Sequence, residues 1–319
     1  MCTSAVYKNY FGRNLDFDIS YGERVVIQPR NFPIKMRMEE DIEKHYAMIG
    51  MASVIDGQPL FYDAVNEKGV GIAGLLFAGN ATYYEPVEGK KNVTPFEFIP
   101  WLLGQAGSVE EVKELLKNCN IVNVPFSEEL PLTPMHWMIS DKEQSITVET
   151  LESGMKVYDN PVGVLTNNPP FDMQMFALRD YMSLHTNQVE NTAFPGLDLE
   201  PYSRGFGGLG LPGDLSSKSR FIKATFTKMN SLSEKEGDLS QFFHILDSVC
   251  QQRGLVHMGD GKYEITIYSS CCDLDTGVYY YKTYDCSQIK AVRMRSVDLD
   301  GSEITVSLID TEDEIKYLV

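Results

Sequence analysis

The sequence predicts an α+β protein, in which antiparallel sheets pack against helices. Strand-like runs fill the first ninety residues, helical patterns follow, and strand-like runs return in the last third. Such blocks differ from the regular strand–helix alternation of a doubly wound fold. No proline- or serine-rich linker and no internal repeat divides the 319 residues. We therefore expect one domain spanning residues 1–319, a length that a single large domain can reach.

The expected strands are short runs rich in Val, Ile, Tyr and Phe that turn residues separate. In the first ninety residues they are Cys2–Tyr7, Gly12–Phe17, Arg24–Gln28, Tyr46–Ile55, Pro59–Val65 and Gly71–Leu76. In the middle of the chain they are Met135–Ser140, Ile146–Leu151, Met155–Tyr158 and Val162–Thr166. In the last third they are Tyr263–Ser269, Gly277–Thr283, Ile289–Met294 and Glu303–Ile309.

Two capping boxes predict where helices begin. Thr94-Pro95-Phe96-Glu97 places proline at the first helical position and predicts a helix toward Gly104, kinked at Pro100. Ser108-Val109-Glu110-Glu111 predicts a second helix, through about Asn118. Apolar periodicity predicts further helices over 171–183, 216–229 and 238–252, and the Pro-, Gly- and Asn-rich segment 186–213 reads as a long irregular loop.

Composition excludes several function classes. A hydrophobic content of 43% is ample for a large core. The net charge of −17 disfavours nucleic acid, whose phosphates attract basic surfaces. No apolar run approaches the length of a membrane span, and no signal-peptide pattern is visible, so we expect a cytoplasmic protein. The six cysteines lack paired spacing and are expected to be free thiols.

Three sequence patterns resemble nucleotide- or metal-binding motifs but do not meet the requirements of those motifs. Gly205–Gly210 matches a dinucleotide-binding glycine pattern, but no strand leads into it and no helix follows, so a turning loop is the better interpretation. The Asp-rich stretches 273–277 and 298–301 lack the final acid of a calcium loop and are interpreted as hairpin turns. Scattered histidines and adjacent Cys271-Cys272 give no metal-ligand spacing.

The second residue carries the candidate chemistry. Cys2 is small enough for the initiator methionine to be removed, which would leave a thiol and a free α-amine on one residue. An unperturbed α-amine has a pKa of about 7.7–8 and can act as a general base near neutral pH. The thiol would then be the nucleophile. A frayed, incidental terminal residue is the alternative.

Four polar residues could support Cys2. Arg13 and Asp16 lie in an expected strand, where a hairpin could fold them against the terminus. Arg13 would favour the thiolate, and Asp16 could accept a hydrogen bond from the α-amine. Asn167 at a strand end could donate to an oxyanion, and Arg220 begins a helix. The alternatives are a surface ion pair, a plain turn and a solvated arginine.

Taken together, these residues resemble the choloylglycine hydrolase family, a group of N-terminal-nucleophile hydrolases that includes bile salt hydrolases and penicillin V acylases. The segments that carry the resemblance span almost the whole chain and keep the family order. They are Met1–Thr3, Gly12–Asp16, Pro29–Phe32, Asn66–Gly69, His136–Asp141, Gly163–Asn167, Gly208–Asp214 and Phe242–Leu246.

The resemblance implies a four-layer αββα sandwich and a mature N-terminal Cys2 that attacks an amide carbonyl. By position, Arg13 lies beside the nucleophile, Asp16 binds the α-amine, Asn167 donates to the oxyanion and Arg220 supports the site. Family members use no metal or cofactor. They are often homotetramers, and the region matching Thr186–Gly210 helps assembly.

Leu76 departs from the family pattern. The position is typically Asn in bile salt hydrolases and Tyr in penicillin V acylases, and its backbone N–H contributes to the oxyanion hole. Leucine keeps that donor but loses a polar side chain facing the substrate, which would shift preference toward more apolar groups.

The resemblance implies hydrolysis of the amide that joins a bile acid to glycine or taurine. A penicillin V acylase or broader N-acyl amidase is the alternative enzyme. A non-catalytic bile-acid-binding protein is the alternative outside enzymes.

Overall fold

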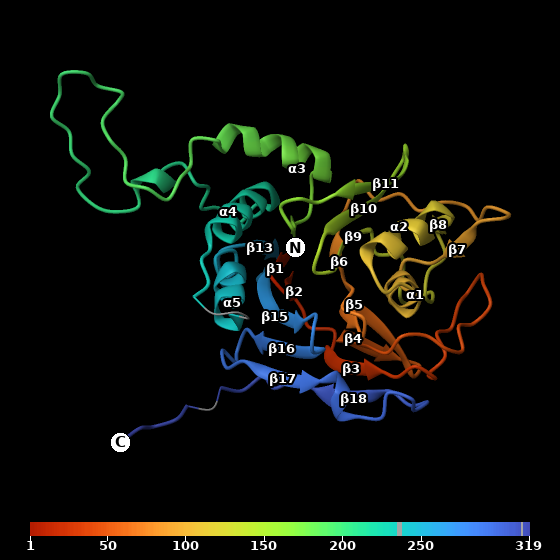
Figure 1. Ribbon diagram of the computed structural model, residues 1–319. Coiled ribbons are helices and arrows are strands. Elements are labelled where there is room, and N and C mark those ends of the chain that lie inside the picture. The colour runs from red at the N-terminus through yellow and green to blue at the C-terminus, as the bar shows by residue number, and fades with distance from the viewer. Residues whose placement is uncertain (235–237, 314) are drawn as a thin grey trace.

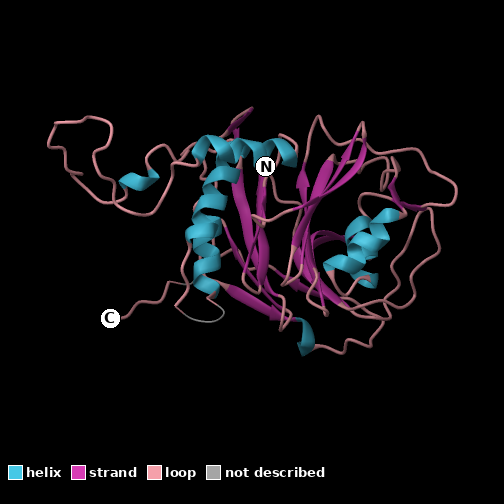
Figure 2. Cartoon of the chain, turned by 45° about the horizontal axis from the view of Figure 1, so that its top comes forward, coloured by secondary structure: helices cyan, strands magenta, loops and turns pink. Residues whose placement is uncertain are grey.

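A computed structural model describes residues 1–234, 238–313 and 315–319, and it contains two stacked sheets between layers of helices (Figure 1). Within the two large sheets every strand pair is antiparallel. Helices lie outside both sheets, as Figure 2 shows. The predicted four-layer αββα architecture is thereby confirmed.

The six-stranded sheet carries Cys2, Arg13 and Asp16 of the candidate site. In spatial order its strands are β12 (Val164–Leu165), β1 (Cys2–Tyr7), β2 (Tyr10–Phe17), β15 (Ile265–Asp273), β16 (Val278–Thr283) and β17 (Lys290–Arg293). Its outer face is covered by α4 (Ser217–Asn230) and α5 (Leu239–Asp247), and α3 (Phe171–Ala177) packs against α4.

The eight-stranded sheet faces it. Its order is β11 (Gly154–Asp159), β10 (Ser145–Leu151), β9 (Met135–Ser140), β6 (Gly71–Leu76), β5 (Gln58–Asn66), β4 (Met48–Ile55), β3 (Arg24–Gln28) and β18 (Thr305–Leu308). Its outer face packs against α1 (Phe98–Gln105) and α2 (Val109–Lys117).

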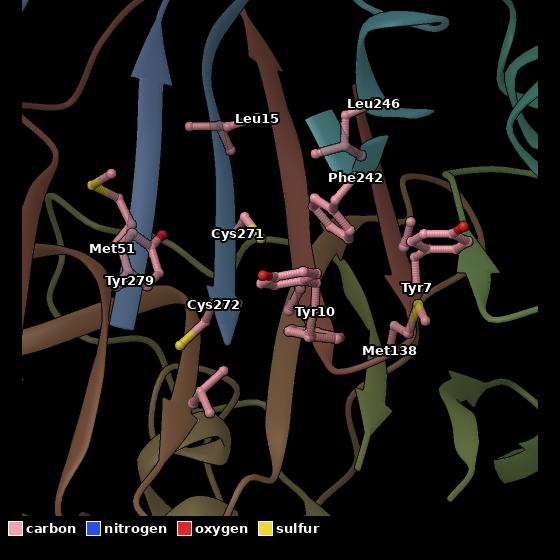
Figure 3. Close-up of a cluster of buried hydrophobic side chains, with 14 of the residues drawn as sticks. Tyr7, Tyr10, Leu15, Met51, Met138, Phe242, Leu246, Cys271, Cys272 and Tyr279 are labelled. Atoms are coloured by element: carbon pink, nitrogen blue, oxygen red, sulfur yellow. The ribbon is translucent and has the colours of Figure 1, made fainter. Parts of the chain in front are cut away.

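Apolar side chains fill the space between the sheets. Figure 3 shows Leu15 and Tyr279 of one sheet in the same cluster as Met51 and Met138 of the other. The same cluster continues to Phe242 and Leu246 of α5. Burial of this apolar surface, at roughly 25 cal/mol per Å², is what holds the two sheets together.

The expected strands are all present, with ends shifted by a few residues. Four short strands were not expected: the parallel pair β7 (Lys91–Val93) and β8 (Cys119–Ile121), and β13 (His257–Gly259) with β14 (Lys262–Tyr263). They are too short to show a periodic pattern, which is why the sequence did not indicate them.

The first capping box was misplaced. Helix α1 begins at Phe98, not at Pro95, and 95–97 form a turn. Glu97 accepts the backbone N–H of Thr94 (3.1 Å), as in a capping box, but the Thr94 hydroxyl has no hydrogen-bond partner among the described residues, so the other half of the box is missing. Pro100 then falls in the first helical turn, where its missing N–H costs no hydrogen bond and requires no kink. The second capping box is confirmed, since Ser108 accepts the N–H of Glu111.

Two other expected helices are shorter than predicted. The helix from Phe171 ends at Ala177 and continues as a 3₁₀ turn, Leu178–Tyr181, and α5 ends at Asp247 rather than near Gln252. One turn was also misassigned. Residues 273–277 do form the β15–β16 hairpin, but 298–301 lie between β17 and β18, which belong to different sheets.

Residues 186–213 contain one 3₁₀ turn, Phe206–Gly208, and otherwise no helix or strand. This arm extends away from the sheets (Figure 1). Gly205, within the glycine pattern, has φ 86°, a left-handed conformation that favours glycine. Several large apolar side chains of the arm are exposed: Phe194, Leu197, Leu199, Tyr202 and Leu209. In the part of the chain that the structure describes, no helix could cross a membrane.

Candidate active site

The β1–β2 hairpin brings Arg13 and Asp16 to the chain's start, as predicted. Cys2 lies opposite Leu15 and Ser4 opposite Arg13. The backbone of Met1 pairs with Asp16, whose N–H donates to the Met1 carbonyl (2.8 Å). Because side chains alternate along a strand, Cys2 and Arg13 point toward the facing sheet, whereas Asp16 points toward the helices.

Asn167 reaches the terminus from the end of β12. Its Oδ1 accepts the backbone N–H of Cys2 at 2.7 Å. Its Nδ2 donates to the carbonyl of Leu76, also at 2.7 Å. The side chain of Asn167 therefore connects the backbone nitrogen of the candidate nucleophile with strand β6 of the facing sheet.

Arg220 of α4 is fully buried and contacts both Cys2 and Asn167. Its Nη1 donates to the Cys2 carbonyl (2.6 Å) and to Thr3 Oγ1 (2.7 Å). Its Nη2 donates to Asn167 Oδ1 (2.8 Å). Burial lowers the pKa of Arg220, and the Asp16 carboxylate, 3.8 Å away, opposes that effect. Arginine remains protonated in proteins, so a fixed cation lies beside the terminus.

Asp16 is held on the helix side of the sheet. Thr266 donates to one of its oxygens (2.6 Å) and Gln251 to the other (3.3 Å). A β-bulge between Thr266 and Tyr268 turns Thr266 toward Asp16. Burial raises the pKa of Asp16, and Arg220 is the main charge that opposes this.

Arg13 crosses from its own sheet to the facing one. Its Nη1 donates to the carbonyls of Gly74 (2.5 Å) and Tyr62 (3.1 Å), and Nη2 has no hydrogen-bond partner among the described residues. Burial lowers the pKa of Arg13, but the neighbouring Cys2 and other anionic groups outweigh it and raise the pKa overall. A second guanidinium cation thus lies near the thiol.

Strand β6 offers an open edge at this place. β5 pairs with β6 only as far as Ala73, so the backbone groups of β6 beyond Ala73 are not paired with β5. Arg13 donates to the Gly74 carbonyl there. Phe77 donates to Pro134, which makes Leu76 a non-hydrogen-bonded position opposite β9. At such a position N–H and C=O both point away from the partner strand, here toward Asn167.

Sequence reasoning missed several neighbours. Glu264, only 2% exposed, forms an ion pair with the α-amine of Met1. Burial lowers the pKa of that amine, and the charges of Cys2 and Asp16 oppose the effect. Gln251 and Thr266 were also missed. A single polar residue beside an apolar run gives no sign of what it faces, so the sequence held no usable signal.

The arrangement places a thiol, a backbone nitrogen at the terminus, two guanidinium groups and an amide side chain together. Of the described residues, no group of three His, Cys, Asp or Glu side chains could hold a metal ion. A cysteine at the N-terminal end of a strand, on two stacked antiparallel sheets between helices, is the arrangement of the N-terminal-nucleophile hydrolases.

Comparison with known proteins gives the family. A model of the linear amide C–N hydrolases, choloylglycine hydrolase family, matches residues 1–307. The chain belongs to this family and is a hydrolase of linear amide C–N bonds, which disfavours the non-catalytic alternative.

Individual relatives agree with the family. A "Bile salt hydrolase/transferase" of Lactiplantibacillus plantarum is 56% identical over 309 residues, 95% of each chain. A protein of the same name from Clostridium perfringens is 41% identical over 314 residues, again 95% of each. A solved variant of conjugated bile acid hydrolase from Clostridium perfringens superposes with a TM-score of 0.94, at 38% identity and full coverage of both chains. Penicillin V acylase from Agrobacterium tumefaciens (TM-score 0.73, 17% identity, 98% of this chain and 94% of that one) shares the fold.

Proposed function

We propose that this enzyme hydrolyses the amide bond between a bile acid and glycine or taurine. The observation that carries the proposal is the 56% identity, over 95% of both chains, to a protein named bile salt hydrolase/transferase. The hydrogen bonds that gather Cys2, Asn167 and Arg220 support it. The likeness to penicillin V acylase concerns the fold alone and favours no second substrate.

Catalysis would begin once removal of Met1 frees the α-amine of Cys2. The amine takes the thiol proton, and the thiolate attacks the amide carbonyl to form a C–S bond. When the tetrahedral intermediate collapses, the C–N bond breaks and the ammonium gives its proton to the departing glycine or taurine nitrogen. Water, deprotonated by the same amine, then cleaves the thioester, and the proton returns to sulfur.

The proposed oxyanion donors lie where β6 meets Asn167. The backbone N–H of Leu76 and the Asn167 amide face the same space, beside Cys2. Asp16 and Arg220 would hold the amine end of the site from the helix side. Arg13 would stabilise the thiolate from the inter-sheet side, in keeping with its overall raised pKa.

A substrate panel tests the proposal. Purified enzyme is incubated with glycocholate, taurocholate and penicillin V, and released amine is measured, with intact mass recording whether Met1 is absent. We expect turnover of the two conjugates to exceed that of penicillin V. Faster turnover of penicillin V, or no turnover of either conjugate by protein that lacks Met1, would contradict it.

Leu76→Asn tests the departure from the family pattern. Leu76 is partly exposed, and asparagine would restore a polar side chain there without removing the backbone donor. We expect kcat/KM for taurocholate and glycocholate to rise about fivefold relative to an apolar N-acyl amide, as one added hydrogen bond of ~1 kcal/mol would give. An unchanged ratio would remove Leu76 as a determinant of preference.

We further propose a cytoplasmic homotetramer, with the arm 186–213 contributing to assembly. The exposed apolar side chains of the arm support this, because contiguous exposed apolar surface marks interaction sites. Sedimentation equilibrium should give four times the chain mass of 36.0 kDa. Replacing Phe194, Leu197 and Leu199 together with serine should lower that mass, and a wild-type monomer would contradict the proposal.

A further inference from the structure

A buried histidine–glutamate pair lies behind the proposed oxyanion donors. His136 of β9 and Glu149 of β10 are both 0% exposed, and His136 Nδ1 lies 3.0 Å from Glu149 Oε1. The other ring nitrogen, Nε2, lies 2.8 Å from the carbonyl oxygen of Thr166.

The contacts determine how many protons the pair holds. A carbonyl oxygen only accepts, so Nε2 must carry a proton and donate to Thr166. Glu149 Oε1 also accepts the backbone N–H of Phe171 (3.0 Å). One further proton therefore lies between Nδ1 and Oε1, and the pair is neutral overall whichever atom carries it. Such a pair can be buried without leaving an uncompensated charge.

The pair contacts the backbone on both sides of the proposed donors. Thr166, which accepts from His136, directly precedes Asn167. The imidazole also stacks on the ring of Phe77, which directly follows Leu76, with centroids 4.2 Å apart and planes within 5°. One imidazole thus fixes the neighbours of both Asn167 and Leu76, which are far apart in the sequence.

Glu149 extends the same support to α3. By accepting from Phe171 it fixes the first residue of that helix, which carries Gln174. Gln174 Nε2 in turn donates to the Asn167 carbonyl (2.5 Å). The backbone of Asn167 is therefore held both by way of His136 and by way of Glu149.

We propose that His136 and Glu149 form a positioning unit for the oxyanion site, holding Asn167 and the N–H of Leu76 in place without touching substrate. The inference rests on the proposed function. It differs from a general stabilising role because the pair should affect the step in which negative charge develops on oxygen, and not the nucleophilicity of Cys2.

His136→Phe tests it most directly. Phenylalanine keeps a ring against Phe77 but cannot donate to Thr166. Because misplacement of about 1 Å can cost 10²-fold in rate, we expect kcat for glycocholate to fall about 10–100-fold with KM within about twofold. Alkylation of Cys2 by iodoacetamide develops no oxyanion, so its rate should stay within about twofold of wild type.

Three further single variants and one double variant complete the design. Trp137→Phe is the matched control. Trp137 is the next residue of β9 and is equally buried, but it packs in the cluster that contains α1 and α2. Its indole nitrogen has no hydrogen-bond partner among the described residues, so the substitution removes no hydrogen bond. His136→Gln restores a donor and should recover part of the lost kcat. Glu149→Gln preserves shape and should lower kcat less than His136→Phe. If the two residues act as a unit, the double variant should be no slower than His136→Phe alone.

Hydrogen exchange of residues 164–174 gives a readout that does not need turnover. We expect faster exchange there in His136→Phe than in Trp137→Phe. The inference is overturned if exchange matches the control, if kcat stays within twofold of the control, or if Cys2 alkylation slows in parallel with kcat. A wild-type enzyme inactive on both conjugates would contradict the proposed function instead, and exchange would still decide the positioning role.

Discussion

Replacing Cys2 by alanine is expected to lower kcat for glycocholate by at least about 10⁴-fold, because removal of a catalytic nucleophile leaves only the contributions of binding and oxyanion stabilisation. The backbone contacts of Cys2, to Asn167 Oδ1 and Arg220 Nη1, do not involve sulfur. The variant should therefore fold normally. Released glycine and far-ultraviolet circular dichroism measure the two quantities.

Cys119→Ala is the matched control for the loss of a thiol. Cys119 is buried in β8, where burial raises the pKa of its thiol to about 12, so it carries no thiolate near neutral pH. Its removal should leave kcat unchanged. Wild-type turnover by Cys2→Ala would refute the mechanism whatever the control shows.

Replacing Asn167 by alanine is expected to lower kcat about 10²–10³-fold, the usual cost of one oxyanion donor. The change also leaves Arg220 Nη2 and the Leu76 carbonyl without the partner that each has in Asn167. Unpaired buried polar groups cost about 1–3 kcal/mol each, so the free energy of unfolding should fall as well. Single-turnover kinetics and urea unfolding report the two effects separately.

Asn168→Ala controls for the position of that substitution. Asn168 is adjacent but donates to the Ala78 carbonyl at a more exposed place, so kcat should change little. Equal loss of kcat in both variants would indicate disturbance of the loop rather than loss of a donor. Full activity of Asn167→Ala would exclude Asn167 from oxyanion stabilisation.

Part of the site could be predicted because its residues lie on strands that are adjacent in the sequence. The strands β1 and β2 have runs of apolar residues and a turn between them, and their hairpin alone brings Arg13 and Asp16 to Cys2. Asn167 and Arg220 come from far along the chain, and only the family resemblance linked them to Cys2. The roles of all these residues remain predictions that the variants above test.

What the sequence could not show depends on register. His136 and Glu149 meet because β9 and β10 are aligned so that Val148 lies opposite Trp137, and a shift of one residue would separate them. The pair of Met1 with Glu264 likewise requires β15 to lie beside β2. The start of α1 was predicted wrongly for a different reason: Thr94 and Glu97 match a capping box in sequence, but the Thr94 hydroxyl has no hydrogen-bond partner among the described residues.

Strand alternation at the terminus separates two groups that belong to one residue. The sulfur of Cys2 lies on the side of Arg13, whereas its nitrogen donates to Asn167 and its carbonyl accepts from Arg220, which lies 3.8 Å from Asp16 on the helix side. Substitutions on the two surfaces of a single β-sheet would therefore reach the thiol and the backbone of the same residue through different neighbours.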